Sequence, residues 1–223
     1  MLRRLIRRYQ AACQESGFLL RLLFSIAFFA LSVTISFYAI GYTNTHASNG
    51  VTDLILSNIP VFDVGGLFVY GTLLMVAFIV LLCLVRPKRF PFILDSLALF
   101  WVIRSIFTSL THIGPFATQT PYNLDINLGA VVGRFFIGND LFFSGHTGAA
   151  FLMALIFWES KGLRYIFITW SVFFAIVLLL GHIHYSIDVA SAFFITYTIY
   201  RICEYVFPRS RALFLSDPLV PQN

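Results

Sequence analysis

Six long apolar segments, separated by shorter polar stretches, dominate the hydropathy pattern of this chain. They cover about residues 18–42, 64–85, 91–111, 141–158, 163–181 and 185–207. A helix needs about 20 apolar residues to cross the hydrocarbon core of a bilayer, and each segment is near or above that length. The pattern therefore predicts an all-α fold, a bundle of six transmembrane helices.

The composition supports a membrane location for most of the chain. It is 59% hydrophobic and 11% charged, whereas soluble domains carry about 25% charged residues. We expect an interfacial cytoplasmic segment over residues 1–17, one six-span membrane domain over 18–207 and a short cytoplasmic tail over 208–223. Basic and apolar residues alternate in the first segment, as in a helix that lies on anionic lipid. The alternative is that its positive charge only orients the chain in the membrane.

The positive charge of the chain, +5 at neutral pH, is explained by topology. Basic residues stand at segment ends and form no stripe, so nucleic-acid binding is not expected. Of the 15 Lys and Arg residues, all except Arg104 and Arg134 fall on one side of a six-span arrangement. The positive-inside rule then places both termini in the cytoplasm. All five histidines fall on the opposite side, and the three cysteines lie near cytoplasmic ends, so no disulfide is expected.

Two polar motifs stand where loops meet apolar segments: Asp140-Leu-Phe-Phe-Ser-Gly-His-Thr147 and His182-Ile-His-Tyr-Ser-Ile-Asp188. Ionisable side chains are costly at membrane depth, so such a cluster is a functional-site hypothesis. Four residues separate His184 from Asp188, which places both on one helical face. The carboxylate can then hold one ring nitrogen and leave the other free to attack. A plainer interpretation is a buried polar pair that satisfies itself between helices.

These motifs resemble the sphingomyelin synthase branch of the type 2 phosphatidic acid phosphatase (PAP2) superfamily. That branch has S-G-H-T followed by H-Y-[ST]-x-D-V, and the similarity continues through 188–194. Weaker similarity lies at Arg104–Thr111 with Pro115, and at Asp53 with Pro60. The resemblance covers about residues 50–207.

The chain departs from the hydrolytic members of the superfamily. Phe143 stands where their motif has proline, and Leu178 stands where they have a phosphate-binding arginine. These differences favour the sphingomyelin synthase branch and leave Arg104 as the candidate cation for the phosphate. The alternative for Arg104 is a structural ion pair with an aspartate such as Asp140.

The resemblance implies a role for each site residue. His184 would be the nucleophile, Asp188 would orient it and His146 would act as general acid. Ser144 and Gly145 open a helix whose first N–H groups can hold a phosphate. Asp140 would balance a positive head group or simply cap a helix. Tyr185, one of several aromatic residues near that face, would contact the substrate, where a quaternary ammonium can be held by a cation–π interaction.

The function implied is an integral-membrane lipid phosphotransferase. It would move phosphocholine or phosphoethanolamine from a glycerophospholipid donor to a lipid alcohol such as ceramide or diacylglycerol, through a phosphohistidine. Alternatives are a lipid phosphate phosphatase or phospholipase C-like hydrolase with the same residues, and a non-enzymatic lipid transporter. No cofactor is expected. No metal is expected either, because His182 and His184 would not share a helical face.

The same topology predicts where the chemistry takes place. The site would face the non-cytoplasmic side of a multi-pass membrane protein. That side is periplasmic in the favoured case of a bacterial inner membrane, and lumenal or extracellular in a eukaryote. The length of the loop over 112–140 indicates a task of its own, such as capping a site.

Overall fold

The computed structural model describes residues 2–119 and 141–217, and all regular structure in these ranges is helical. In chain order the helices are α1 (Leu2–Cys13), α2 (Phe18–His46), α3 (Gly65–Val85), η1 (Pro87–Arg89), α4 (Phe90–Leu110), α6 (Gly145–Ile156), α7 (Lys161–Leu180), α8 (Ser186–Val206) and α9 (Pro208–Leu215).

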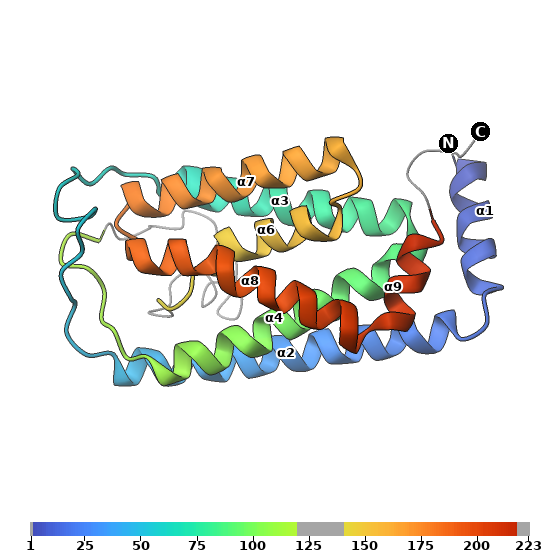
Figure 1. The fold of residues 1–223 in the computed structure, drawn as a ribbon, viewed down its shortest axis with the longest axis horizontal. Helices are drawn as coiled ribbons and strands as arrows, with labels where there is room; N and C mark the ends of the chain where they lie inside the picture. The colour runs from blue at the N-terminus through green and yellow to red at the C-terminus, as the bar shows by residue number, and fades with distance from the viewer. Residues whose placement is uncertain (1, 120–140, 218–223) are drawn as a thin grey trace.

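The long helices run up and down along one axis, while α1 crosses one end of the bundle (Figure 1). We call this end, where α1 and α9 lie, the α1 end. The opposite end, called the loop end, carries the connections over 47–64, 111–119 and 181–185. The first and last described residues both lie at the α1 end (Figure 1).

Within residues 2–119 and 141–217, four helical segments are long and apolar enough to cross a membrane: Phe18–His46, Gly65–Val85, Pro87–Leu110 and Lys161–Leu180. Helix α6 has 12 residues, which at 1.5 Å per residue gives about 18 Å, less than the hydrocarbon core. Helix α8 has 21 residues but carries Asp188, Arg201 and Glu204. The apolar helical bundle agrees with the predicted fold class, whereas six spans and the orientation of the termini stay predictions.

Helix α6 lies at the centre of the bundle, packed against α7, α8 and α4. Gly148 allows this close packing. A Cβ atom on Gly148 would lie 2.8 Å from the ring of Phe100 and 2.8 Å from Oγ1 of Thr196. The start of α6 is thereby held at one depth between its neighbours.

Several polar side chains inside the bundle are paired within the protein, which an apolar surrounding favours. The hydroxyls of Ser25 and Thr72 donate to carbonyls one turn earlier in their own helices, at 2.9 and 2.8 Å. Ser36 of α2 and Ser105 of α4 share a hydrogen bond of 2.9 Å, which joins the two helices that pack along each other most extensively.

Charged and polar contacts close the α1 end. Arg8 and Tyr9 of α1 donate to the carbonyls of Val85 and Leu84, both at 3.1 Å. Lys88 pairs with Glu15 at 2.5 Å, and Arg86 with Asp217 at 2.7 Å. Helix α1 thus bridges the end of α3, as a segment lying along the bundle end would; its contact with lipid stays a prediction.

The packing of Gly148 generates a stability prediction. Gly148→Ala should lower the free energy of unfolding by about 1–3 kcal/mol, because the added methyl overpacks the contact of α6 with α4 and α8. Thermal unfolding in detergent micelles measures the change. Gly66→Ala in α3 is the matched control: its Cβ meets nothing within 4 Å, so the helix propensity of alanine should make it neutral or slightly stabilising. Equal midpoints for the two variants would contradict the packing account.

Candidate active site

The starts of two helices meet at the loop end of the bundle. Helix α6 begins at Gly145 and α8 at Ser186. The backbone N–H of Ser144 donates to the backbone carbonyl of Asp188 at 3.1 Å. This contact brings the S-G-H-T and H-Y-S-I-D motifs together, although about 40 residues separate them along the chain.

His184 is held by two acceptors on the same ring nitrogen. Its Nδ1 lies 3.0 Å from the carbonyl oxygen of Leu141 and 3.3 Å from Oδ2 of Asp188. A carbonyl oxygen only accepts hydrogen bonds, so we assign the proton to Nδ1. In the neutral ring Nε2 then carries the lone pair, which is the form that a nucleophile requires.

The contact between His184 and Asp188 arises differently from the sequence-based expectation. We expected both residues on one helical turn, but α8 begins only at Ser186, with Tyr185 as its N-cap. Oδ2 of Asp188 turns back to accept the N–H of Tyr185 at 3.0 Å, and this capping interaction places the same oxygen beside His184.

The first turn of α6 is fixed by three hydroxyls. Oγ of Ser144 accepts the N–H of Thr147 at 3.4 Å and contacts Oγ1 of Thr147 at 3.1 Å. Ser171 of α7 donates to the carbonyl of Thr147 at 2.9 Å. The N-terminal end of α6 therefore holds a defined position, and such an end favours an anion.

His146 follows in that first turn, and its ring packs between aromatic side chains. The centroid of the Phe68 ring of α3 lies 4.6 Å away and that of Phe174 of α7 lies 5.6 Å away. His184 and Arg104 contact the residues that lead into this turn, through the carbonyls of Leu141 and Phe143. The structure thus gathers the two histidines and one arginine from three different segments.

Arg104 reaches the start of α6 from α4, and its side chain is buried. Its Nε donates to the carbonyl of Phe143 at 2.8 Å, and its guanidinium lies 5.6 Å from the centre of the Trp101 ring. A Cβ on Gly145 would come within 2.9 Å of Nε of Arg104. Glycine at this position therefore allows the guanidinium to approach the helix start.

Two positions that differ from the hydrolytic pattern are filled by apolar packing. Leu178 is fully buried in the core, and the Phe143 ring packs against that of Phe100 at 5.6 Å. Among the residues that the structure describes, Arg104 of α4 brings a cation to the start of α6, whereas the Leu178 position brings none. Asp140, with its alternative ion pair to Arg104, lies outside the described residues.

Tyr185 faces away from the helix starts and connects the outer loops. Its hydroxyl donates to the carbonyl of Gly114 at 2.9 Å and accepts the N–H of Val51 at 3.1 Å. The side chain is 1% exposed. In this structure the Tyr185 hydroxyl both donates and accepts within the protein, and its substrate contact stays a prediction.

Asp53 connects the loop over 47–64 to the start of α8, a role that the sequence did not predict. Its Oδ1 accepts the N–H groups of Ile55 and Leu56 at 2.8 and 3.0 Å, and its Oδ2 accepts the N–H and hydroxyl of Ser186 at 2.7 and 2.8 Å. Burial raises the pKa of the Asp53 carboxyl, but these hydrogen bonds outweigh burial and bring the pKa below the ordinary value of 3.8. The only sequence signal was the weak similarity around Asp53 and Pro60.

Comparison with protein-family models matches residues 138–205 to the family described as PAP2 superfamily C-terminal. This region contains both histidine motifs, and the match supports the PAP2 superfamily without separating its branches. No curated protein and no solved structure gives a significant match. The match and the long apolar helices together fit a membrane lipid phosphatase or phosphotransferase.

The hydrogen bonds of Asp53 generate a pH prediction. In Asp53→Asn an amide N–H₂ would face the N–H of Ser186, so the free energy of unfolding at neutral pH should fall by about 1.5–3 kcal/mol. Because the folded pKa is depressed, the stabilisation is complete above the unfolded pKa and is lost as pH falls through the folded pKa. The difference between wild type and variant should therefore shrink below about pH 4.

Unfolding midpoints measured from neutral pH downward test this account. Asp63→Asn is the control, because Asp63 is exposed and caps α3 through one hydrogen bond of 3.2 Å to Gly65. It should cost at most about 1 kcal/mol. A difference for Asp53→Asn that persists undiminished into the acid range would assign the effect to something other than the charged carboxylate.

Proposed function

We propose that the protein is a lipid phosphotransferase that moves a phospho-head-group from a glycerophospholipid to a lipid alcohol such as ceramide or diacylglycerol. The head group would be phosphocholine or phosphoethanolamine. The observation that carries this proposal is the orientation of His184, whose Nδ1 is held by Leu141 and Asp188. This happens at the loop end, where α6 with His146 begins and where Arg104 binds the carbonyl of Phe143.

The first half-reaction transfers the head group to the protein. Nε2 of His184 attacks the phosphorus, and the bond from phosphorus to the glycerol oxygen breaks. Protonated His146 gives its proton to that oxygen, so diacylglycerol leaves as a neutral alcohol. His184 then carries the phospho-head-group through a nitrogen–phosphorus bond.

The second half-reaction uses the same residues in reverse. The hydroxyl of the acceptor lipid gives its proton to His146 and attacks the phosphorus, and the bond to His184 breaks. Asp188 and the Leu141 carbonyl keep the ring in place by accepting from Nδ1, as the third member of a catalytic triad does.

Two features of the site would stabilise the negative charge of the phosphate. Arg104 supplies a fixed cation at the start of α6. The N-terminal ends of α6 and α8 add partial positive charge, since both helices start at the site. Stabilisation of this kind matters most in the transition state, where negative charge gathers on the phosphoryl oxygens.

A hydrolase is the second candidate, because the family match covers phosphatases as well as transferases. It would use the same first half-reaction, and water would replace the lipid alcohol in the second. The two reactions differ only in the acceptor, so their products distinguish them.

The transferase predicts an acceptor-dependent product. Purified protein in liposomes that contain phosphatidylcholine or phosphatidylethanolamine labelled in the head group should transfer the label to ceramide or diacylglycerol, in proportion to the acceptor. Thin-layer chromatography and lipid mass spectrometry measure the product. Release of free phosphate or a phosphorylated base at every acceptor concentration would identify a hydrolase. If neither transfer nor hydrolysis is detected, or if the activity persists in His184→Ala, a lipid transporter remains.

The two histidines are predicted to differ in their dependence on the leaving group. His184→Ala should abolish turnover and the acid-labile phosphohistidine. His146→Ala should slow turnover by about 10²–10⁴-fold, and a nitrophenyl phosphodiester donor, which leaves without a proton, should partly restore it. Asp188→Asn should fall between these variants, because it disturbs the orientation of His184 without removing the nucleophile. Rescue of His184→Ala in place of His146→Ala would reverse the assigned roles.

A further inference from the structure

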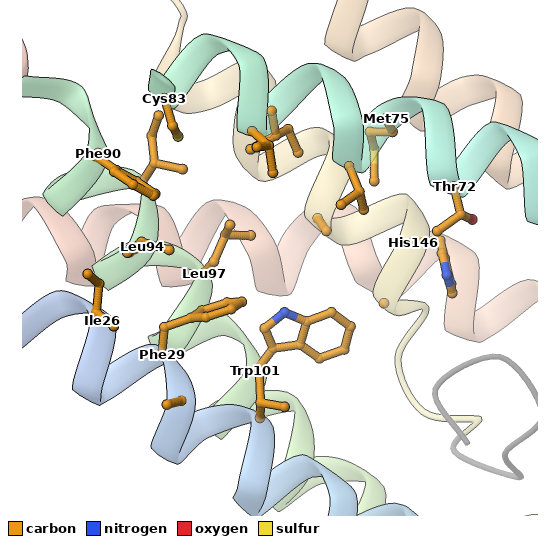
Figure 2. Close-up of a pocket in the computed structure, with 18 residues that line it drawn as sticks. Ile26, Phe29, Thr72, Met75, Cys83, Phe90, Leu94, Leu97, Trp101 and His146 are labelled. Carbon is orange, nitrogen blue, oxygen red and sulfur yellow. The ribbon is translucent and has the colours of Figure 1, made fainter. Parts of the chain in front are cut away.

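An apolar cavity leads from His146 toward the α1 end. Its volume is about 700 Å³, and it lies between α2, α3 and α4, with the start of α6 at one end. Figure 2 shows His146 and Thr72 at that end and Cys83 and Phe90 at the other. The cavity thus reaches the site at His146 and Gly145, in the first turn of α6.

The lining repeats at helical spacing on each of three helices. It comprises Ile26, Phe29, Ala30 and Val33 of α2, Thr72, Met75, Val76, Ile79, Val80 and Cys83 of α3, and Phe90, Ile93, Leu94, Leu97 and Trp101 of α4, with Gly145, His146 and Ala149 of α6. In the described chain no carboxylate, lysine or arginine lines it. The Thr72 hydroxyl donates its hydrogen bond to the backbone carbonyl of Phe68. Water in this space would find few polar partners besides the rings of Trp101 and His146, so hydrocarbon suits it better.

The length of the cavity is close to the thickness of one leaflet of a bilayer. From Thr72 to Cys83 the helix advances about 16 Å at 1.5 Å per residue, and half of the hydrocarbon core is about 15 Å. Just beyond Cys83, Arg8 and Tyr9 contact the carbonyls of Val85 and Leu84. A longer chain would have to enter this polar layer.

The cavity is also reached from the side. Val76, Val80 and Ile26 line it and are each 45% exposed or more. The neighbouring helices do not close this side, since α2 packs along α4 and α3 packs against α7. A hydrocarbon chain can therefore enter between α2 and α3 while its head group stays at the loop end.

We propose that this cavity holds one hydrocarbon chain of the donor lipid and limits the length of that chain. The proposal rests on the proposed function, which places the donor phosphate beside His146 and His184. A chain in the cavity keeps the glycerol oxygen next to His146, which must protonate it. The floor formed by Cys83 and Phe90 excludes chains longer than one leaflet.

Photolabelling tests occupancy without requiring turnover. A phosphatidylethanolamine whose palmitoyl chain ends in a diazirine is incorporated into liposomes with the wild-type protein, irradiated, and the labelled peptides are mapped by mass spectrometry. Label should concentrate around Cys83, Phe90 and Leu94, and excess unlabelled phosphatidylethanolamine should reduce it. Equal labelling of outward-facing residues such as Leu74 and Leu81, without competition, would show bulk bilayer lipid only and overturn the proposal.

A filled cavity should change the preference for chain length. Ile79→Trp occupies the middle of the cavity. It should lower kcat/KM for dipalmitoyl phosphatidylethanolamine by about tenfold or more relative to the dihexanoyl lipid, because overpacking an apolar site costs that much. Leu81→Trp, on the exposed face of the same helix, should leave that ratio unchanged. Thermal unfolding of both variants verifies that they are folded.

The two experiments separate this inference from the proposed function. Competed labelling at Cys83 without any turnover supports the chain site and removes the phosphotransferase. Turnover with an unchanged chain-length ratio in Ile79→Trp and dispersed labelling removes the chain site and leaves the phosphotransferase in place.

Discussion

The fully buried carboxylate of Asp188 is the interaction on which the geometry of the site depends. Its Oδ2 accepts the N–H of Tyr185 and lies beside Nδ1 of His184, while the backbone carbonyl of the same residue accepts the N–H of Ser144. A buried carboxylate is tolerated only when such partners are present. One residue therefore sets the start of α8 and the position of α6 and, together with the Leu141 carbonyl, the tautomer of His184. A change in any of these three would leave a buried donor or acceptor unpaired.

The first turn of α8 shows how the outer loops are coupled to this site. The first N–H groups of a helix have no partner within it, and here two aspartates accept them in succession. Asp188 takes the N–H of Tyr185, and Asp53 takes the N–H of Ser186. Both carboxylates also lie at the positive end of the helix dipole, where negative charge is favoured. The loop over 47–64 is thus attached to the residue that follows Tyr185, two positions from His184.

Hydropathy predicted the long helices well, because burial in an apolar surrounding is what determines their extent. The segment predicted at 185–207 became Ser186–Val206, and that at 163–181 became Lys161–Leu180. The segment predicted at 141–158 proved to be a shorter helix, since Ser144 caps it and the apolar residues before Ser144 pack against protein. Motif spacing correctly predicted the contact between His184 and Asp188, but the contact arises from the capping of α8 and not from a shared helical turn. The approach of Arg104 to Gly145, the bond between Asp53 and Ser186 and the loop contacts of Tyr185 join distant segments and leave no local pattern.

The apolar and polar parts of a lipid substrate would then have separate tasks. A chain that moves from the bilayer into the cavity leaves one hydrocarbon surrounding for another, so the hydrophobic effect contributes little to the affinity. What the cavity supplies is shape: a chain that fits fills it at the density of a protein interior, whereas a mismatched chain leaves a void or overpacks it. The same contacts act equally in the ground state and in the transition state and cannot lower the barrier by themselves. The barrier must be lowered at the loop end, by the oriented ring of His184, the proton of His146 and the charge of Arg104. The cavity determines which lipid presents its phosphate to them.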